Sequence, residues 1–570
     1  MNIKRKFLLV ILLCLSSILL AQYDQKAILL KQANNLIVHR QYEKANQLYE
    51  QILAESPVDY SVVELYIWNL LRISKVKIAA EKLELYHSDM PEVTYIRLHA
   101  SILINQGELK KARDETMDFL SRNQGNIYFY RNFSMIFEQY RQDEIAIEIL
   151  EMARKAANDE NLYTRELAID YQNVKDYDKA VTEFFKLLQN QPGFVNYALS
   201  RLKMILQEDD TVIKYIEKTA SSYEDPLVIE VLAMCFAQVG NYEKALENYD
   251  RIDPAKLLVF AQTMSVEDKL DIAEQAYRNY IRKINDPASR ANAKVKLAEV
   301  LIVAGRIDEA KTVLSQVRDD SDITKPQYRY RTRANLDCRL MLAQIAIIRD
   351  ESKINVLDFM NDAKNYTYNT NDISQIEYQI IRFLMLSGDF AESSTKLKTL
   401  LQNEQPETDA FKLGYYYAFQ LAMMQHDPAA DSLLGEIIIN LPDNAETNDA
   451  LLLAMLQTNL NQEQKDEFLT AYRLKLLFKD ETAIEKLLAL SEESQNEEFR
   501  ILAAEWAISA NDKEQAVALL STDFQNPVLS EYAKLKLVDI TQDVWLSRDF
   551  LQSNPQSVFS PEFRKILEKL

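Results

Sequence analysis

Glycine, proline, histidine and cysteine are all scarce in this chain of 570 residues. It contains 8 glycines, 13 prolines, 4 histidines and 3 cysteines. So few turn-forming residues disfavour an all-β protein with many tight turns, and they also disfavour a disordered or collagen-like chain. No two histidines stand at metal-ligand spacing, and neither Cys235 nor Cys338 has a second cysteine nearby. The sequence therefore predicts no metal ion and no cofactor.

The two cysteines beyond the N-terminal segment lie among apolar residues, in "LAMCFA" and "LDCRLMLA". Such surroundings are typical of buried free thiols. An oxidising compartment would also permit a disulfide between them. We favour two buried thiols.

Recognised catalytic motifs are lacking as well. Gly-x-Ser-x-Gly is absent, and the eight glycines are too isolated to form a loop that cradles phosphate. Carboxylates are abundant, but on helical surfaces they usually form a solvated face. The sequence therefore predicts that the chain is not an enzyme, and an enzyme with an unrecognised site remains an alternative.

Positive charge is in deficit, because the formal net charge is −20. A field of this sign repels phosphate backbones and anionic membranes, so we expect no nucleic-acid partner. The segment "QYRYRTR" (327–333) interleaves Arg329, Arg331 and Arg333 with tyrosines, and Arg339 follows. This pattern occurs in nucleic-acid-binding proteins. In an acidic chain we favour a helix start after Pro326 instead, and we expect "GYYYAF" (414–419) to pack in the core.

Long apolar runs are limited to the first residues, "MNIKRKFLLVILLCLSSILLAQ". Three basic residues precede an apolar run from Phe7 to Leu20, which is too short to span a membrane comfortably but is typical of a signal peptide. We predict a signal peptide over residues 1–21. Leu19 is larger than the usual residue before a cleavage site, so an uncleaved anchor remains an alternative. The mature chain is predicted to have no membrane span and to be secreted across the inner membrane, to the periplasm of a Gram-negative bacterium or its surface.

What the chain does contain is a repeat. Residues 41–50 read "QYEKANQLYE", and residues 241–250 read "NYEKALENYD". We define the reference residue of each repeat as the residue two before the "YEKA" tyrosine. Reference residues then recur every 32 to 34 positions, and such a steady period indicates stacked repeats. They are Arg40, Ser74, Gly107, Arg141, Lys175, Gln207 and Gly240.

Other positions of the repeat follow the same period. A small residue stands five positions after most reference residues, as in Ala45, Ala146 and Ala245, and another stands seven positions before, as in Ala33 and Ala233. Small side chains let two helices approach closely, and glycine at the reference residue suits a left-handed helix cap. Apolar residues at i, i+3, i+4 and i+7 inside each repeat are typical of helices. Each repeat is therefore predicted to be helix, turn, helix.

These residues resemble the tetratricopeptide repeat (TPR) family, with "GNYEKALENYD", the preceding small residue and prolines such as Pro192 between units. The resemblance implies an all-α, right-handed TPR-like α-solenoid of about 13 helix-turn-helix repeats. Regular repeats are predicted over 22–285, longer degenerate repeats over 286–525 and capping helices over 526–570. The later reference residues are Asp268, Gly305, Asp350, Gly388, Gln425, Asn461 and Asn511.

In the TPR family, the first helix of each pair lines a concave groove. Ten positions before the reference residue, that resemblance places Arg97, Arg131 and Arg165 in the groove. None has an acidic residue three or four positions away, so local ion pairs do not explain them. Pairing with more distant carboxylates is the alternative. The other groove candidates are Arg72, Asn105, Gln139, Asn173, Trp68 and Tyr128.

A groove with arginines, amides and aromatic rings suits an extended or acidic peptide, because guanidinium groups bind carboxylates in pairs. The sequence therefore predicts an exported TPR scaffold or adaptor that binds a protein or peptide partner in the cell envelope, where envelope complexes are candidate partners. The alternative from another class is a glycan-binding helical-repeat protein of the outer membrane. Such proteins typically show a lipid-acceptor cysteine and exposed tryptophans, and we expect neither here.

Overall fold

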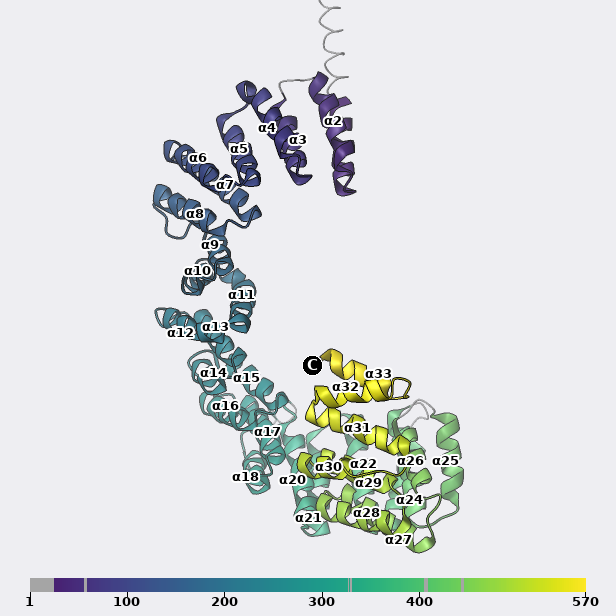
Figure 1. Cartoon of the computed structure of the whole chain (residues 1–570). Helices are drawn as coiled ribbons and strands as arrows, with labels where there is room; N and C mark the ends of the chain where they lie inside the picture. The colour runs from purple at the N-terminus through teal and green to yellow at the C-terminus, as the bar shows by residue number, and fades with distance from the viewer. Residues whose placement is uncertain are drawn as a thin grey trace, which may run out of the picture. The chain divides into compact units, whose positions relative to one another are not determined.

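The computed structural model describes residues 25–55, 59–325, 328, 331–403, 408–441 and 445–569. The predicted signal peptide, residues 1–21, lies outside them. Every regular element in this part of the chain is a helix, and no strand occurs there (Figure 1). The predicted all-α fold is therefore confirmed. The chain divides into two compact units, one ending at Leu257 and the other beginning at Leu258.

The first unit is a series of antiparallel helix pairs. The unit begins with a helix over residues 25–38. It ends inside α15 (Pro254–Val266), which continues into the second unit. The helices between are α2 (Tyr42–Glu55), α3 (Tyr60–Arg72), α4 (Val76–Leu85), α5 (Glu92–Gln106), α6 (Leu109–Arg122), α7 (Ile127–Gln139), α8 (Asp143–Ala157), α9 (Thr164–Asn173), α10 (Tyr177–Asn190), α11 (Val195–Glu208), α12 (Ile213–Ala220), α13 (Pro226–Gln238) and α14 (Tyr242–Tyr249).

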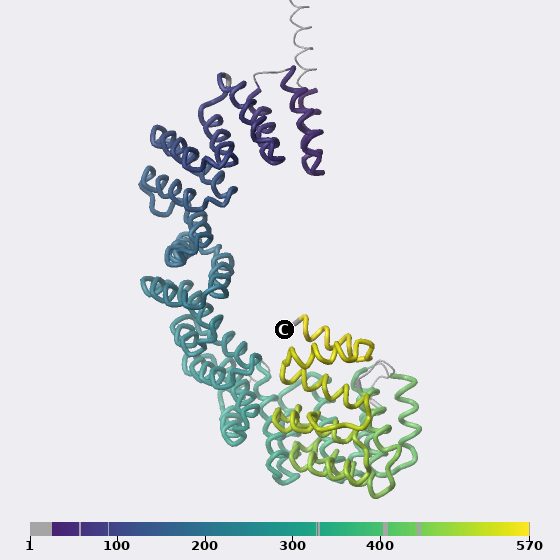
Figure 2. Tube along the Cα trace, viewed as in Figure 1, coloured from purple at the N-terminus to yellow at the C-terminus, as the bar shows by residue number. Residues whose placement is uncertain are grey.

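The second unit continues with helices of similar length, and its chain winds back on itself (Figure 2). Its helices are α16 (Leu270–Lys283), α17 (Pro287–Val303), α18 (Ile307–Arg318), α20 (Ala334–Ile348), α21 (Lys353–Ala363), α22 (Thr370–Leu386), α23 (Phe390–Asn403), α24 (Asp409–Met424), α25 (Ala429–Asn440), α26 (Ala445–Leu456), α27 (Gln462–Leu476), α28 (Asp480–Ser494), α29 (Glu498–Ser509), α30 (Lys513–Leu520), α31 (Pro527–Thr541), α32 (Val544–Ser553) and α33 (Ser560–Lys569).

The turn inside most hairpins is set by one left-handed residue. Most predicted reference residues have positive φ, for example Arg40 at 57° and Gly107 at 83°. The amide of the next residue then donates to the carbonyl five positions back, as from Glu108 N to Leu103 O at 2.9 Å. This is the Schellman arrangement, which satisfies the last carbonyls of the first helix. The repeat period is therefore the spacing of these turns.

Three predicted reference residues were wrong. Gln207 lies inside α11. The chain turns after this helix instead, at Asp209, whose Oδ1 accepts from Thr211 N. The left-handed residue near Gln425 is its neighbour His426. Asn461 begins α27 with a capping box and does not end a helix. The turn that follows is at Phe478, whose φ is +60°.

The small-residue positions are the points where helices touch. Ala45, Ala146 and Ala245 are fully buried, as are Ala33 and Ala233. Larger side chains at these positions would force the two helices of a hairpin apart, which typically costs about 1–3 kcal/mol. The two similar decapeptides are therefore alike because each must pack in the same way.

Both cysteines are buried free thiols, Cys235 in the first unit and Cys338 in the second. Burial raises the pKa of the Cys235 thiol to about 12 and that of Cys338 to about 11. Tyr416 and Tyr417 of "GYYYAF" are also buried, as expected. Within the described ranges, no helix has the length and apolarity needed to cross a lipid bilayer.

Candidate binding surfaces

One face of α7 brings together three of the predicted groove residues, Tyr128, Arg131 and Gln139, and adds Met135. Tyr128, Arg131, Met135 and Gln139 are spaced by three or four positions, so they lie on the same side of the helix. Tyr128 is 81% exposed and Met135 is 52% exposed. Large apolar side chains so open to solvent are costly unless something covers them, which makes this face a candidate contact surface.

Arg97, Arg131 and Arg165 each have a carboxylate partner. Arg97 on α5 forms an ion pair with Glu64 of α3, one repeat earlier, and Trp68 Nε1 donates to the same carboxylate at 3.4 Å. Arg165 pairs with the adjacent Glu166 at 2.9 Å. Arg97 therefore pairs with a carboxylate distant in the sequence, which was the alternative to a ligand site. Its side chain nevertheless stays partly open to solvent.

Arg131 is held within its own helix. Its guanidinium pairs with Glu138, seven residues on, and donates to Ser134 Oγ at 2.8 Å. Both charged side chains are about a quarter exposed. Ion pairs at this level of exposure are typically worth less than about 1 kcal/mol, so a ligand carboxylate can displace the internal one.

The remaining predicted groove residues lie at the helix ends. Arg72 stacks over the Tyr42 ring at 5.6 Å from its centroid. Asn105 Nδ2 donates to Tyr140 Oη at 2.8 Å, and Asn173 Nδ2 donates to Asp143 Oδ1 at 3.0 Å. These contacts join neighbouring helices, which is a structural use of the amides. Whether the set also binds a ligand stays a prediction.

A buried carboxyl lies close to this face. Asp170 of α9 is 2% exposed, and its Oδ2 has no hydrogen-bond partner. Burial raises its pKa to about 8, and the nearby charges of Glu138 and Asp143 add to the shift while Arg131 opposes it. Among the residues that the structure describes, no three His, Cys, Asp or Glu side chains are placed to hold a metal ion.

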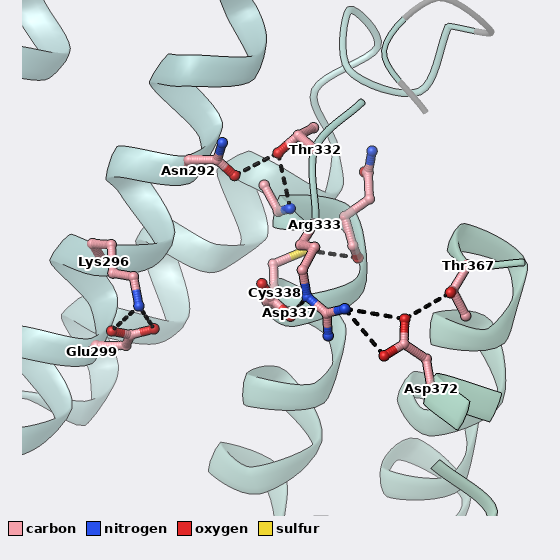
Figure 3. Close-up of polar contacts among 11 residues, drawn as sticks. Asn292, Lys296, Glu299, Thr332, Arg333, Asp337, Cys338, Thr367 and Asp372 are labelled. Carbon is pink, nitrogen blue, oxygen red and sulfur yellow. Dashed lines mark hydrogen bonds and ion pairs between the residues drawn. The ribbon is translucent and has the colours of Figure 1, made fainter. Parts of the chain in front are cut away.

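The basic segment before α20 is engaged in packing. Arg333 Nη1 contacts both carboxylate oxygens of Asp372 at 3.1 Å, and Arg333 also faces Asp337 at 3.6 Å (Figure 3). Arg339 is buried, pairs with Asp362 and stacks over Tyr366 at 3.8 Å. Arg331 is exposed, and Arg329 lies outside the described residues. Two of the four arginines thus join α20 to its neighbours.

Trp545 corrects the expectation of no exposed tryptophan. It lies on α32 and is 78% exposed, whereas Trp506 is buried and Trp68 packs partly against the core of the first unit. Asp543 caps this helix by accepting from Trp545 N at 2.8 Å, so the ring is free to point outward. The local pattern "DVWLSRDF" gave no sign of this exposure.

The second unit contains a half-open cavity of about 280 Å³ that sequence reasoning missed. Its walls come from α20, α21, α22 and the turn after α27, so residues more than a hundred positions apart meet there. Most of the lining is apolar, including Leu340, Met341, Ile347 and Phe383, and the polar members are Gln344, Gln379 and Arg382. Phe478, the unexpected turn residue, also lines it.

No family model matches this chain, and no curated protein matches it. Similar solved structures include a chain of Naa15/Naa10 bound to HypK-THB, at 11% identity over 96% of this chain and 100% of that chain, with a TM-score of 0.24. Another is the C-terminal part of a TPR repeat-containing protein from Cytophaga hutchinsonii, at 19% identity over 44% of this chain and 94% of that chain, also with a TM-score of 0.24. TM-scores this low carry no argument about function.

The class of protein therefore rests on the chain's own geometry. Left-handed turns recur at the repeat period, each joins two antiparallel helices, and the small positions between those helices are buried. The chain is an all-α helical-repeat protein with TPR-like hairpins.

Proposed function

We propose that this chain is a scaffold that binds a protein or peptide partner along the exposed face of α7 and the matching faces of α3, α5 and α9. The observation that carries the proposal is the 81% exposure of Tyr128 beside Arg131, with Met135 on the same face. Tyrosine, arginine and methionine are the residues enriched at protein interfaces. A face that combines them offers an aromatic contact and a cation for an acidic side chain.

Arg97, Arg131 and Arg165 would supply the charge for this surface. Each now contacts a carboxylate of the protein itself, and each pair is reachable by solvent. An acidic partner can therefore exchange with the internal carboxylates at small cost. The spacing of one arginine per repeat matches an extended partner that runs along successive hairpins.

The test is site-specific photo-crosslinking in cells with the crosslinker at position 128. We expect one discrete adduct, and we expect its yield to fall at least about tenfold when Arg97, Arg131 and Arg165 are all replaced by alanine, since paired charge-assisted bonds are lost. A crosslinker at Lys111, an exposed position on α6, is the matched control. Circular dichroism should show that the triple variant keeps its helices. An adduct of unchanged yield in the folded triple variant would refute the arginine surface.

We also propose that this scaffold acts in the cell envelope, on the basis of the signal-like residues 1–21. A fusion of the full chain to alkaline phosphatase, which is active only outside the cytoplasm, should be active. The same fusion begun at Gln22 should be inactive. Mass spectrometry of the exported chain would show whether cleavage follows Ala21. Equal activity of both fusions would exclude the proposed location.

A further inference from the structure

We propose that the cavity of the second unit is a separate binding site, which takes a peptide segment of a partner protein in which a large apolar side chain stands next to an Asp or Glu carboxylate. The site shares no residue with the face of α7. The inference therefore goes beyond the function proposed above and can fail without it.

The first observation is an uncompensated cation. Arg382 lines the cavity and is only partly buried. No carboxylate among the described residues lies within ion-pair distance of it, although the full sequence carries a formal charge of −20. Burial raises the pKa values of the Tyr417 and Tyr472 phenols, and the positive charge of Arg382 offsets part of this rise. A guanidinium with an apolar floor beside it suits an incoming carboxylate.

The second observation is the residue at the turn. Phe478 adopts φ of +60° and is 42% exposed. Bulky side chains rarely adopt this conformation, and the other hairpin turns carry glycine or a polar residue there. Backbone strain of this kind persists only where the surroundings impose it, and it is common at ligand sites. The Phe478 ring therefore lies exposed at the cavity edge, where it can pack against an apolar side chain that enters the cavity.

The cavity walls are fixed before any ligand arrives. Arg473 donates to Leu386 O, the last carbonyl of α22, from Nη2 at 2.7 Å and from Nε at 3.2 Å. Lys479 Nζ donates to Ile348 O, the last carbonyl of α20, at 3.2 Å. Cations at helix C-termini satisfy orphan carbonyls and complement the helix dipole. These bonds hold the turn at Phe478 against the ends of α20 and α22.

Size and rim favour a peptide as occupant. With a volume of about 280 Å³, the cavity is smaller than the usual pockets for drug-sized ligands, about 300–1,000 Å³, and it suits one large apolar side chain. The side-chain amides of Gln344 and Gln379 can each donate and accept, so they match a peptide group. Because the cavity is half-open, a side chain can enter it from solvent.

Fluorescence anisotropy with the full chain tests this, with labelled Gly-Ser-Glu-Phe-Glu-Ser-Gly as the probe. We expect it to bind at least about tenfold more tightly than the same peptide with Gln for both Glu, or with Ser for Phe. Arg382→Gln should abolish the preference for Glu over Gln. Phe478→Gly should weaken binding about fivefold without lowering the melting temperature, because glycine adopts positive φ without strain.

The variant with alanine at 97, 131 and 165 is the matched control, and it should bind the probe as the wild type does. Equal affinity for the Glu and Gln peptides would overturn the proposal, as would an unchanged preference in Arg382→Gln. Binding of sodium octanoate at this site with no binding of the peptide would overturn it in favour of a small amphiphile.

Discussion

Replacing Arg154 by methionine is expected to lower the free energy of unfolding of the first unit by about 3 kcal/mol. Arg154 and Glu183 are both buried, and their side chains form two parallel bonds, at 2.9 Å and 2.5 Å. Arg154 Nε also donates to Leu162 O at 2.8 Å. The pair joins α8 to α10 across the loop before α9. Methionine would leave the Glu183 carboxylate buried, with only Lys186 at 3.0 Å to offset its charge.

Urea unfolding measures this effect in a background with phenylalanine at Trp506 and Trp545, so that Trp68 alone reports on the first unit. Arg113→Met is the matched control, because its pair with Glu148 is exposed, and we expect a loss below about 1 kcal/mol. The double variant with methionine at 154 and 183 should recover most of the loss, since no buried charge remains. A single variant within about 1 kcal/mol of wild type would contradict a tightly buried pair.

The fold could be read from the sequence because it depends on short-range constraints. A left-handed turn and two small residues recur in each hairpin, so their spacing is visible as a period. The wrongly predicted reference residues also arose from these short-range signals. Asparagine favours both left-handed turns and helix N-caps, and Asn461 is an N-cap. Phenylalanine favours neither left-handed turns nor helix N-caps, so the sequence did not predict the turn at Phe478.

The candidate sites depend on longer distances. Arg97 pairs with a residue 33 positions earlier, and helix-local spacing cannot show that. The cavity lined by Arg382 and Phe478 exists because α27 returns to the ends of α20 and α22. That return is the sum of small rotations between successive hairpins. Those rotations are set by side-chain packing and leave no period in the sequence.

Replacing Asp170 by asparagine is expected to stabilise the first unit at pH 8 by at least about 2 kcal/mol, because a neutral amide replaces a buried carboxyl that is partly charged at that pH. Its folded pKa of about 8 lies above the ordinary value of 3.8, so the folded state binds this proton more tightly than the unfolded state does. The stabilisation from the bound proton is complete below about pH 4 and is lost as the pH rises through about 8. Wild type should therefore lose stability across this window relative to the variant.

The same Trp68 background and urea titrations at pH 5 and pH 8 measure this difference. At pH 5 only the part of the proton-linked stabilisation that lies between about pH 4 and pH 5 has been lost, so the gain from Asp170→Asn should be well below the gain at pH 8. Asp118→Asn, on the exposed face of α6, should stay within about 0.5 kcal/mol of wild type at both values. Equal gains at pH 5 and pH 8 would mean that the stabilisation comes from the amide's hydrogen bonds and not from removal of the charge. A gain much larger at pH 8 than at pH 5 would identify Asp170 as a titrating carboxyl. Because the charge of Arg131 acts on Asp170, capture of an acidic partner by that arginine should then vary with pH over the same range.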